Sequence, residues 1–232
     1  MELPRTAMDA YTRQGAGIGA GALAFDWLHE SGFDGKWGSI LEVGCGACDF
    51  VRRAKALPDT KRVIAVDAAW ASVQTALKAG VSAIHLDVSH DQLPLETNGY
   101  DLVSCTETLE HVANPYHALA EIKRVLKPDA LFVLSFPMPE VCDGYGPWQH
   151  SFVYPGLFAN AALEKFMRQL YFAELVRGTA NNYIGWRIYA NYKGVGMQDI
   201  FEVMASDRDE EGLYGMLPSY AEHILESYDG GA

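Results

Sequence analysis

Cysteine, basic side chains and long apolar runs are all scarce in this chain. Only 4 of its 232 residues are cysteine, and their spacing is not that of a disulfide framework, so we expect reduced thiols and a cytoplasmic protein. No apolar stretch approaches the roughly 20 residues of a membrane-spanning helix, and no basic and apolar leader opens the sequence. The sequence therefore predicts neither a secreted nor a membrane protein.

Basic residues are outnumbered by acidic ones. The 18 Lys and Arg stand against 30 Asp and Glu, which leaves a net charge of -12. Because basic side chains that neutralise phosphates supply most of the affinity for nucleic acid, we expect no nucleic-acid partner. The apolar fraction of 49% and the length allow one globular domain with a sizeable core. The oligomeric state is left open, a homo-oligomer included.

From residue 39 onwards the sequence alternates strand and helix patterns. Strands are predicted at 39–43, 62–66, 83–86, 100–105 and 130–136, and helices at 22–30, 50–57, 71–79 and 114–126, the last ended by Pro128. Further on, we expect a helix at 156–170, strands at 172–177 and 199–205, and a loop or short insertion at 181–193. This alternation predicts an α/β fold of three αβα layers with a mostly parallel, seven-stranded sheet.

The segment Ile40–Asp49 carries the strongest functional signal. An apolar run ends in Glu42 and then in glycines, as where a parallel strand meets a ligand-binding loop. A dinucleotide site would present backbone N–H groups to a pyrophosphate, and here a carboxylate precedes Gly44 and Asp49 replaces the third glycine. A cationic ligand without phosphates fits better, and S-adenosylmethionine carries both a sulfonium and an ammonium group.

Acidic residues end four successive predicted strands: Glu42, Asp67, Asp87 and Glu107. The fold brings these ends to one edge of the sheet, where ligands of open α/β sheets bind. Asp67 follows Gly44 by 23 residues, close to the roughly 20 expected for an acid that binds ribose hydroxyls. We expect Asp87 to accept from the adenine amine, with the Val88 N–H facing a ring nitrogen.

These segments together resemble the class I S-adenosylmethionine-dependent methyltransferases, in particular those that act on small molecules. The resemblance covers residues 36–137 and rests on Ile40–Asp49, Ile64–Asp67, His85–Val88, Tyr100–Val112 and Glu121–Pro128. It implies the Rossmann-like methyltransferase fold, S-adenosyl-L-methionine as cofactor, S-adenosyl-L-homocysteine as its product, a small-molecule acceptor and no metal. The residues that it assigns to the cofactor are Glu42, Gly44, Cys45, Gly46, Asp67, Ala68, Asp87, Val88, Cys105, Thr106 and Glu107.

Cys45 and Cys48 form a Cys-x-x-Cys pair inside the glycine loop. Such a pair can bind metal or do redox chemistry, but no second pair accompanies this one. The sequence therefore disfavours both roles. Cys48 also stands where the family commonly has glycine, which should narrow the conformational freedom of the loop.

Two histidines are candidate bases for removing a proton from an acceptor hydroxyl, because histidine titrates near neutral pH. His111 follows the fourth strand and should face the cofactor, with packing or capping as the alternative. His150 resembles the histidine of a His-x-x-x-Tyr/Phe segment in sugar and lipid methyltransferases, with a structural role as the alternative. Aromatic residues predicted to line an apolar acceptor pocket, or else to pack, are Tyr11, Trp148, Tyr154 and Trp186.

Two motifs of nucleic-acid methylation are missing. An Asp/Asn-Pro-Pro-aromatic turn would directly follow the fourth strand, where this chain has Cys105-Thr-Glu-Thr, and no cysteine follows a proline. We therefore predict methyl transfer to a small molecule, to oxygen first and nitrogen next. A protein or RNA methyltransferase, a non-catalytic cofactor-binding partner subunit and an NAD-binding protein remain as alternatives.

We predict a single methyltransferase domain over residues 1–232. Its expected parts are an N-terminal cap or lid at 1–35, a cofactor-binding half at 36–137, a substrate-side half at 138–206 and an acidic tail at 207–232.

Overall fold

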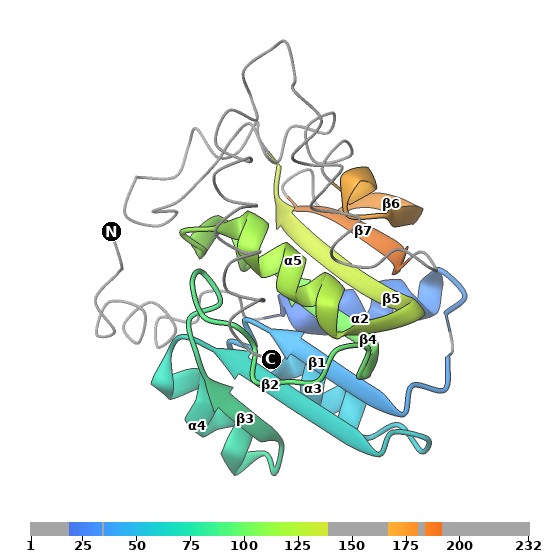
Figure 1. Ribbon diagram of the computed structural model, residues 1–232. Helices are drawn as coiled ribbons and strands as arrows, with labels where there is room; N and C mark the ends of the chain where they lie inside the picture. Colours follow the sequence, from blue (N-terminus) through green and yellow to red (C-terminus); the bar gives the residue numbers. More distant parts are fainter. Residues whose placement is uncertain (1–18, 34, 139–166, 181–183, 192–232) are drawn as a thin grey trace.

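The computed structural model describes residues 19–33, 35–138, 167–180 and 184–191 (Figure 1). Its helices are α2 (Ala20–Glu30), α3 (Asp49–Lys55), α4 (Trp70–Lys78), the 3-10 turn η1 (Leu109–His111) and α5 (Pro115–Val125). Its strands are β1 (Ser39–Val43), β2 (Arg62–Asp67), β3 (Ser82–His85), β4 (Tyr100–Thr106), β5 (Leu126–Pro137), β6 (Phe172–Ala180) and β7 (Ile184–Asn191).

The strands form one sheet in the order β3-β2-β1-β4-β5-β7-β6. The first five strands are parallel to their neighbours, whereas β7 runs antiparallel to both β5 and β6. All five residues of β1 are buried, as expected of a central parallel strand covered on both faces. The predicted α/β fold with a mostly parallel seven-stranded sheet is confirmed.

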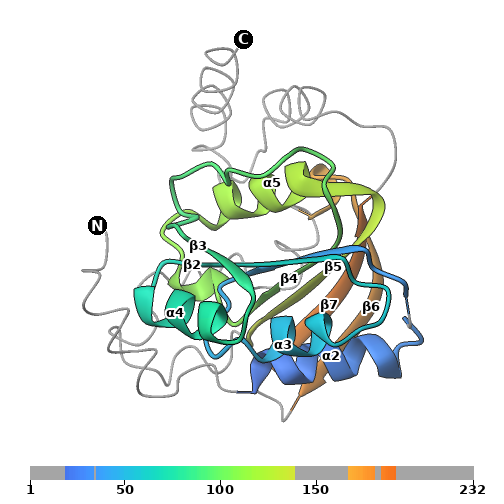
Figure 2. The same cartoon turned by 90° about the horizontal axis from the view of Figure 1, so that it is seen from below.

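Helices cover both faces of the sheet, with α2, α3 and α4 on one side and α5 on the other (Figure 2). The alternation of side chains along each strand divides the core accordingly. Ile40 of β1 packs in a cluster with Phe25 and Phe50 from the α2 and α3 side. Its neighbour Leu41 packs in the larger cluster with Leu119 of α5.

The prediction of a loop or short insertion at 181–193 is wrong for the central part of that segment. Ile184–Asn191 forms β7, a strand that pairs with both β5 and β6. The strand pattern is hidden in the sequence because the buried positions of β7 include Gly185, Arg187 and Asn191, which are not apolar strand formers. The predicted strand at 199–205 and residues 156–166 of the predicted helix lie outside the described residues, while residues 167–169 are helical.

The helix predicted at 114–126 agrees with α5 to within one residue at each end, whereas the strand predicted at 130–136 begins earlier than expected. Helix α5 ends at Val125, and Pro128 lies inside β5, which begins at once at Leu126. Proline disfavours helical backbone in the residue before it, so the chain becomes extended ahead of the ring.

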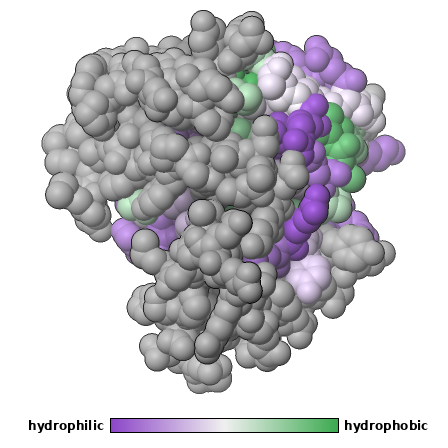
Figure 3. All heavy atoms as spheres, turned by 90° about the horizontal axis from the view of Figure 1, so that it is seen from above, coloured by the Kyte–Doolittle hydropathy of each residue, from purple (hydrophilic) through white to green (hydrophobic). Residues whose placement is uncertain are grey.

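The large exposed hydrophobic residues are isolated from one another in sequence: Leu23, Trp70, Leu77 and Leu175. Viewed from above, the coloured part of the surface is mostly hydrophilic, with small hydrophobic areas (Figure 3). Single exposed apolar side chains of this kind are ordinary in globular proteins. Within the described residues, no helix has both the length and the apolar character needed to cross a membrane.

Candidate functional site

The C-terminal ends of β1, β2, β4 and β5 lie side by side at what we call the carboxyl edge of the sheet. Val43 pairs with Val66 and with Cys105, and Thr106 pairs with Ser135. The loop after β1 begins on top of β2, because the N–H groups of Gly44 and Cys45 donate to the Val66 carbonyl at 2.8 and 3.2 Å. This register brings the predicted site residues of three strands together.

Two glycines shape the loop after β1. Gly44 has φ +77°, and a Cβ added there would collide with the side chain of Thr108, whose hydroxyl donates to the Thr106 carbonyl at 2.9 Å. Gly46 has φ +46° and open space where a Cβ would be. Gly44 is therefore required by a close approach within the protein, whereas Gly46 leaves room for a ligand.

Asp67, at the end of β2, is 8% exposed. Its Oδ2 accepts the Gly46 N–H at 2.9 Å, and its Oδ1 accepts the Ala69 N–H at 2.8 Å. Burial raises the pKa of Asp67 above its ordinary value, although the two backbone N–H groups oppose that rise. Since each carboxylate oxygen has two lone pairs, Asp67 keeps the capacity to accept hydroxyl groups of a ligand.

Glu42 lies beneath the glycine loop and is only 1% exposed. Its Oε2 accepts the N–H of Val51, in the first turn of α3, at 3.3 Å. Burial raises the pKa of Glu42 well above its ordinary value. Gly21 of α2 approaches closely here, because a Cβ on it would lie 3.2 Å from Glu42 Oε1 and 2.9 Å from the Phe50 nitrogen. Glu42 thus joins the loop, α3 and α2.

Glu107 follows β4 and is held in a left-handed backbone conformation, with φ +46°. Its N–H donates to the Ser135 carbonyl and hydroxyl oxygen at 3.2 and 3.1 Å, and that hydroxyl donates to Glu107 Oε1 at 2.9 Å. Burial raises the pKa of Glu107 to about 7. A strained non-glycine backbone persists only where the surroundings hold it, and this often marks a functional site.

Glu110 and His111 lie in η1, one turn beyond Glu107. Glu110 is 1% exposed, and its Oε2 has no hydrogen-bond partner among the described residues. Its Oε1 lies 3.8 Å from His111 Nε2. Burial raises the pKa of Glu110 well above its ordinary value, and the charge of Glu107 adds to that rise. Two acids and an imidazole are therefore close together after β4.

The predicted adenine-side residues lie on the loops after β2 and β3. The Ala68 carbonyl is 2.9 Å from His85 Nε2, which ties the end of β3 to the loop after β2. Asp87 Oδ1 accepts the Ser89 N–H at 2.9 Å, and Val88 is 6% exposed. The structure thus brings these loops together beside Asp67, while their contact with adenine stays a prediction.

The structure describes few of the residues that were predicted for the acceptor side. Tyr11, Trp148, His150 and Tyr154 lie outside the described residues. Trp186 of β7 stacks on Trp27 of α2, with ring centroids 4.9 Å apart and planes 6° from parallel. That packing occupies one face of the Trp186 ring, and contact with an acceptor stays a prediction.

Sequence reasoning missed two residues that organise the carboxyl edge, Thr108 and Ser135. Ser135 is the polar residue near the end of the otherwise apolar run Ala130–Phe136, a break in pattern that could have identified it. Thr108 gave no such signal, because only the tertiary fold brings it against Gly44. No three His, Cys, Asp or Glu side chains in the described ranges form a group that could hold a metal ion.

The arrangement fits a cationic ligand with a ribose. Within the described ranges, the buried carboxyl groups of Glu42, Asp67 and Glu107 have no Lys or Arg partner. Burial disfavours the ionised form of such carboxyl groups, and a positive charge nearby would stabilise that form. Open space at Gly46 lets a ligand approach the loop backbone beside Asp67. The residues present therefore match S-adenosylmethionine, whose ribose and positive charges call for acids at this edge.

The family comparison agrees with this site. Residues 41–134 match the family described as a methyltransferase domain. These residues span β1 to β5 and include every acid described above. Through this part of its sequence the chain is similar to the class I methyltransferases, whose cofactor is S-adenosylmethionine.

Relatives with similar sequences match less than half of the chain. A ubiquinone biosynthesis O-methyltransferase of Maricaulis maris is 34% identical over 102 residues, which are 40% of this chain and 38% of that protein. The enzyme of the same name from Pseudomonas paraeruginosa is 31% identical over 119 residues, 49% of this chain and 50% of that protein. The chain therefore spans half or less of the length of these relatives.

Solved structures share the fold at low identity. A methyltransferase from Aquifex aeolicus has a TM-score of 0.61 and 19% identity, covering 82% of this chain and 99% of its own. A Thermotoga maritima protein, titled a possible histamine N-methyltransferase, has a TM-score of 0.62 and 16% identity, covering 80% and 98%. These neighbours support the fold, and at such identity they support nothing finer.

Proposed function

We propose that this chain transfers the methyl group of S-adenosylmethionine to a small-molecule acceptor, with oxygen as the first acceptor atom to test and nitrogen as the second. The observation that carries the proposal is the row of buried acids at the carboxyl edge, which have raised pKa values and no cationic partner within the described ranges. S-adenosylmethionine, when bound, supplies a methyl group on a positively charged sulfur. The similarity to O-methyltransferases of ubiquinone biosynthesis supports oxygen and a small molecule.

Each acid has its own part in this proposal. Asp67 accepts the ribose hydroxyls while Gly46 and Ala69 hold its carboxylate. Asp87 and the Val88 N–H recognise adenine. The loop residues Gly44 and Cys45, with Glu42 below them, hold the backbone in the conformation that the ligand needs, and the backbone of Cys105 and Thr106 borders the methionine end.

Glu107 is proposed to face the cationic end of the cofactor. Ser135 fixes its carboxyl group from one side, and burial keeps the pKa of that group at about 7. A cation nearby stabilises the ionised form. Binding should therefore release a proton from Glu107 at pH values below 7.

Proximity is expected to supply most of the rate, since methyl transfer needs an in-line approach more than strong acid or base chemistry. An acceptor hydroxyl must still lose its proton. His111 is the proposed base within the described residues, and Glu110 Oε1 lies 3.8 Å from its Nε2. His150 is the alternative base, and if both variants to alanine keep turnover, positioning alone must carry the rate.

We propose that the chain is one domain, in which residues 36–137 hold the cofactor and residues 1–35 and 138–206 form the acceptor side. Tyr11, Trp148, Tyr154 and Trp186 are the proposed aromatic lining of that side. The proposal includes a cytoplasmic location and no nucleic-acid partner, consistent with the net charge of -12. A homo-oligomer is compatible with it.

Calorimetric titration with S-adenosylmethionine and with S-adenosylhomocysteine tests the cofactor. Micromolar binding of both is expected, followed by turnover of some member of a panel of phenols, catechols and amines. Absence of binding to either compound would overturn the proposal. Binding without turnover, together with a co-purifying protein, would favour a partner subunit, a reading suggested by a solved neighbour that is a methyltransferase in complex with an activator.

A further inference from the structure

The glycine loop contains two thiols in contact with each other. Cys45 and Cys48 are 3% and 0% exposed, and their Sγ atoms lie 3.6 Å apart. The backbone of Cys48 is left-handed, with φ +67°, and its N–H donates to the Cys45 carbonyl at 2.6 Å. This tight turn directs both side chains to the same place.

The two thiols differ in acidity. The hydrogen bond between them lowers the pKa of Cys48 and raises the pKa of Cys45. Arg52, in the first turn of α3, also lowers the pKa of Cys48. The thiolate is the nucleophilic form of cysteine, and the lowered pKa favours Cys48 over Cys45 as the thiol that supplies it.

We propose that Cys45 and Cys48 are a modification site at which hydrogen peroxide forms a reversible disulfide, and that this disulfide weakens the binding of S-adenosylmethionine. The Cys48 thiolate attacks one peroxide oxygen, an S–O bond forms, the O–O bond breaks and hydroxide leaves. The Cys45 thiol then attacks the Cys48 sulfur, the S–S bond forms, and the hydroxyl group leaves as water after taking the Cys45 proton. Two thiols and one peroxide thus yield one disulfide and two waters, and an added dithiol reverses the oxidation.

The effect on the cofactor follows from where the loop is anchored. A disulfide has an S–S distance of about 2.0 Å, so the sulfurs must approach from their 3.6 Å separation. Cys45 is tied to β2 through its N–H on the Val66 carbonyl, and the Cys48 carbonyl accepts the Arg52 N–H at 3.1 Å in α3. The backbone between Cys45 and Cys48 must therefore move when the disulfide forms.

Gly46 lies between the two cysteines, and its N–H holds Asp67 Oδ2 at 2.9 Å. Drawing Cys45 and Cys48 together displaces Gly46 and moves the Cys45 side chain, both of which interact with Asp67, the acid proposed to bind ribose. Because coupling between two equilibria is reciprocal, bound S-adenosylmethionine should also oppose formation of the disulfide. This second half of the proposal rests on the proposed function, whereas formation of the disulfide does not.

The test uses the full chain with Cys142→Ser, so that Cys45, Cys48 and Cys105 are the remaining thiols. Reduced protein is treated with hydrogen peroxide, the remaining thiols are alkylated, and the intact mass and peptide map are recorded. We expect a mass lower by two hydrogen atoms before alkylation, a linked Cys45–Cys48 peptide, and an alkylated Cys105. Titration with S-adenosylmethionine should show affinity lowered about tenfold or more, a coupling of the usual allosteric size, and restored by dithiothreitol.

Matched variants separate the alternatives. Cys48→Ser should form no disulfide. Its affinity for S-adenosylmethionine should therefore be the same before and after treatment with hydrogen peroxide. Absence of the linked peptide in the Cys142→Ser protein would overturn the proposal, and a link that leaves affinity unchanged would overturn its second half. If reduced protein fails to bind S-adenosylmethionine, the proposed function and that second half both fall, while the mass measurement still decides whether the disulfide forms.

Discussion

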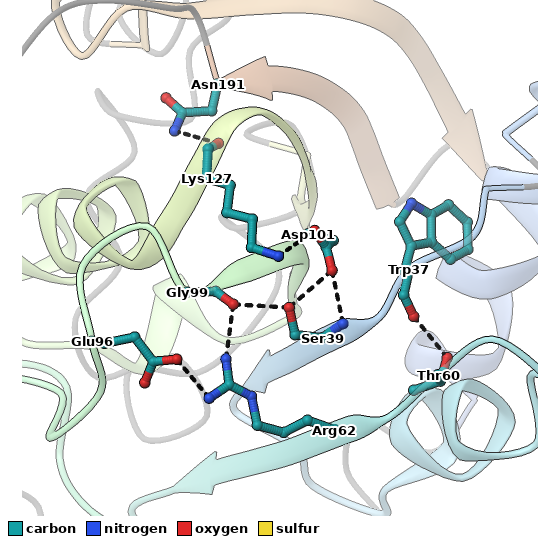
Figure 4. Close-up of polar contacts among 9 residues, drawn as sticks. All are labelled: Trp37, Ser39, Thr60, Arg62, Glu96, Gly99, Asp101, Lys127 and Asn191. Atoms are coloured by element: carbon teal, nitrogen blue, oxygen red, sulfur yellow. Dashed lines mark hydrogen bonds and ion pairs between the residues drawn. The ribbon is translucent and has the colours of Figure 1, made fainter.

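The two edges of the sheet hold their acidic side chains in opposite ways. At the N-terminal ends of the strands, which we call the amino edge, Asp101 accepts the Ser39 N–H at 2.8 Å and Lys127 Nζ at 2.7 Å (Figure 4). Arg62 donates to the Gly99 carbonyl at 2.8 Å and pairs with Glu96 at 2.6 Å. At the carboxyl edge, the acids are buried without such cations within the described ranges.

The pKa values show the consequence of this difference. Burial raises the pKa of Asp101, but the bonds from Lys127 and Ser39 outweigh it and leave the value lowered. Burial raises the pKa of Glu42, Asp67 and Glu107 at the other edge. The chain itself supplies cations for the acids of the amino edge, whereas our proposal assigns that part at the carboxyl edge to a cationic ligand.

Gly44→Ala, at the carboxyl edge, is expected to have the largest effect, a loss of stability. Alanine in a left-handed conformation costs about 1–2 kcal/mol, and the collision with Thr108 adds an overpacking cost of about 1–3 kcal/mol. We expect the free energy of unfolding, measured with urea, to fall by about 2–5 kcal/mol from these two terms. Gly46→Ala is the control, because it has the same backbone strain but open space. Equal losses in both variants would mean that Thr108 does not shape the loop.

Asp67→Asn is expected to weaken S-adenosylmethionine binding by about 1–3 kcal/mol, the usual cost of losing a charged hydrogen-bond partner. The variant keeps the size of the side chain and removes its charge. Calorimetry measures the change, with Asp101→Asn as a control of the same chemistry at the amino edge. Similar affinity losses in both variants would abolish the proposed division between the edges.

Glu107 should make cofactor affinity depend on pH. Its pKa of about 7 means that the ionised form grows as pH rises through 7, so affinity should rise about tenfold between pH 6 and 8, in proportion to that form. In the free protein the raised pKa has the opposite effect on folding, since stability is lost as pH rises from the unfolded value towards 7. Titrations at several pH values should give a flatter profile for Glu107→Gln, and an unchanged profile would refute the role of this carboxyl group.

Asp101→Asn is expected to have the smallest effect, a loss of about 1 kcal/mol in the free energy of unfolding, because its ion pair is partly exposed. A lowered pKa contributes stability above the unfolded pKa, and that contribution disappears as pH falls through the folded value. The difference in stability between wild type and Asp101→Asn should therefore vanish in acid. Urea unfolding at pH 7 and at pH 3 measures it, and a difference that persists in acid would show that packing, not charge, is responsible.

The elements of the cofactor half were predictable because they carry local patterns. Ser39–Val43 has the bounds expected from its apolar run. The strands β2 and β4 differ from prediction by one residue at one end, and α4 by one residue at each end. The acids after these strands were predictable as neighbours, since parallel strands put their ends at one edge. The strand β7 was not, because glycine and polar residues at its buried positions interrupt the apolar alternation that identifies a strand.

The sequence did not show which acidic side chains have hydrogen-bonding or cationic partners. Asp67 and Asp101 both occur at strand ends in similar apolar surroundings. Only the register of β1 with β4 and β5 brings Ser39 and Lys127 to Asp101. Likewise, Ser135 reaches Glu107 because Thr106 pairs with Ser135 across the sheet.

The sequence alone determined the layer order, the glycine loop and the identity of the acids, since strand and helix periodicity and glycine spacing are local properties of a chain. Tertiary structure decided how those groups behave. It placed Thr108 against Gly44, gave Glu107 a pKa of about 7 and brought the two sulfurs of the loop to 3.6 Å. Burial, charge pairing and side-chain contact depend on neighbours that are distant in sequence, and these neighbours are defined only once the sheet has formed.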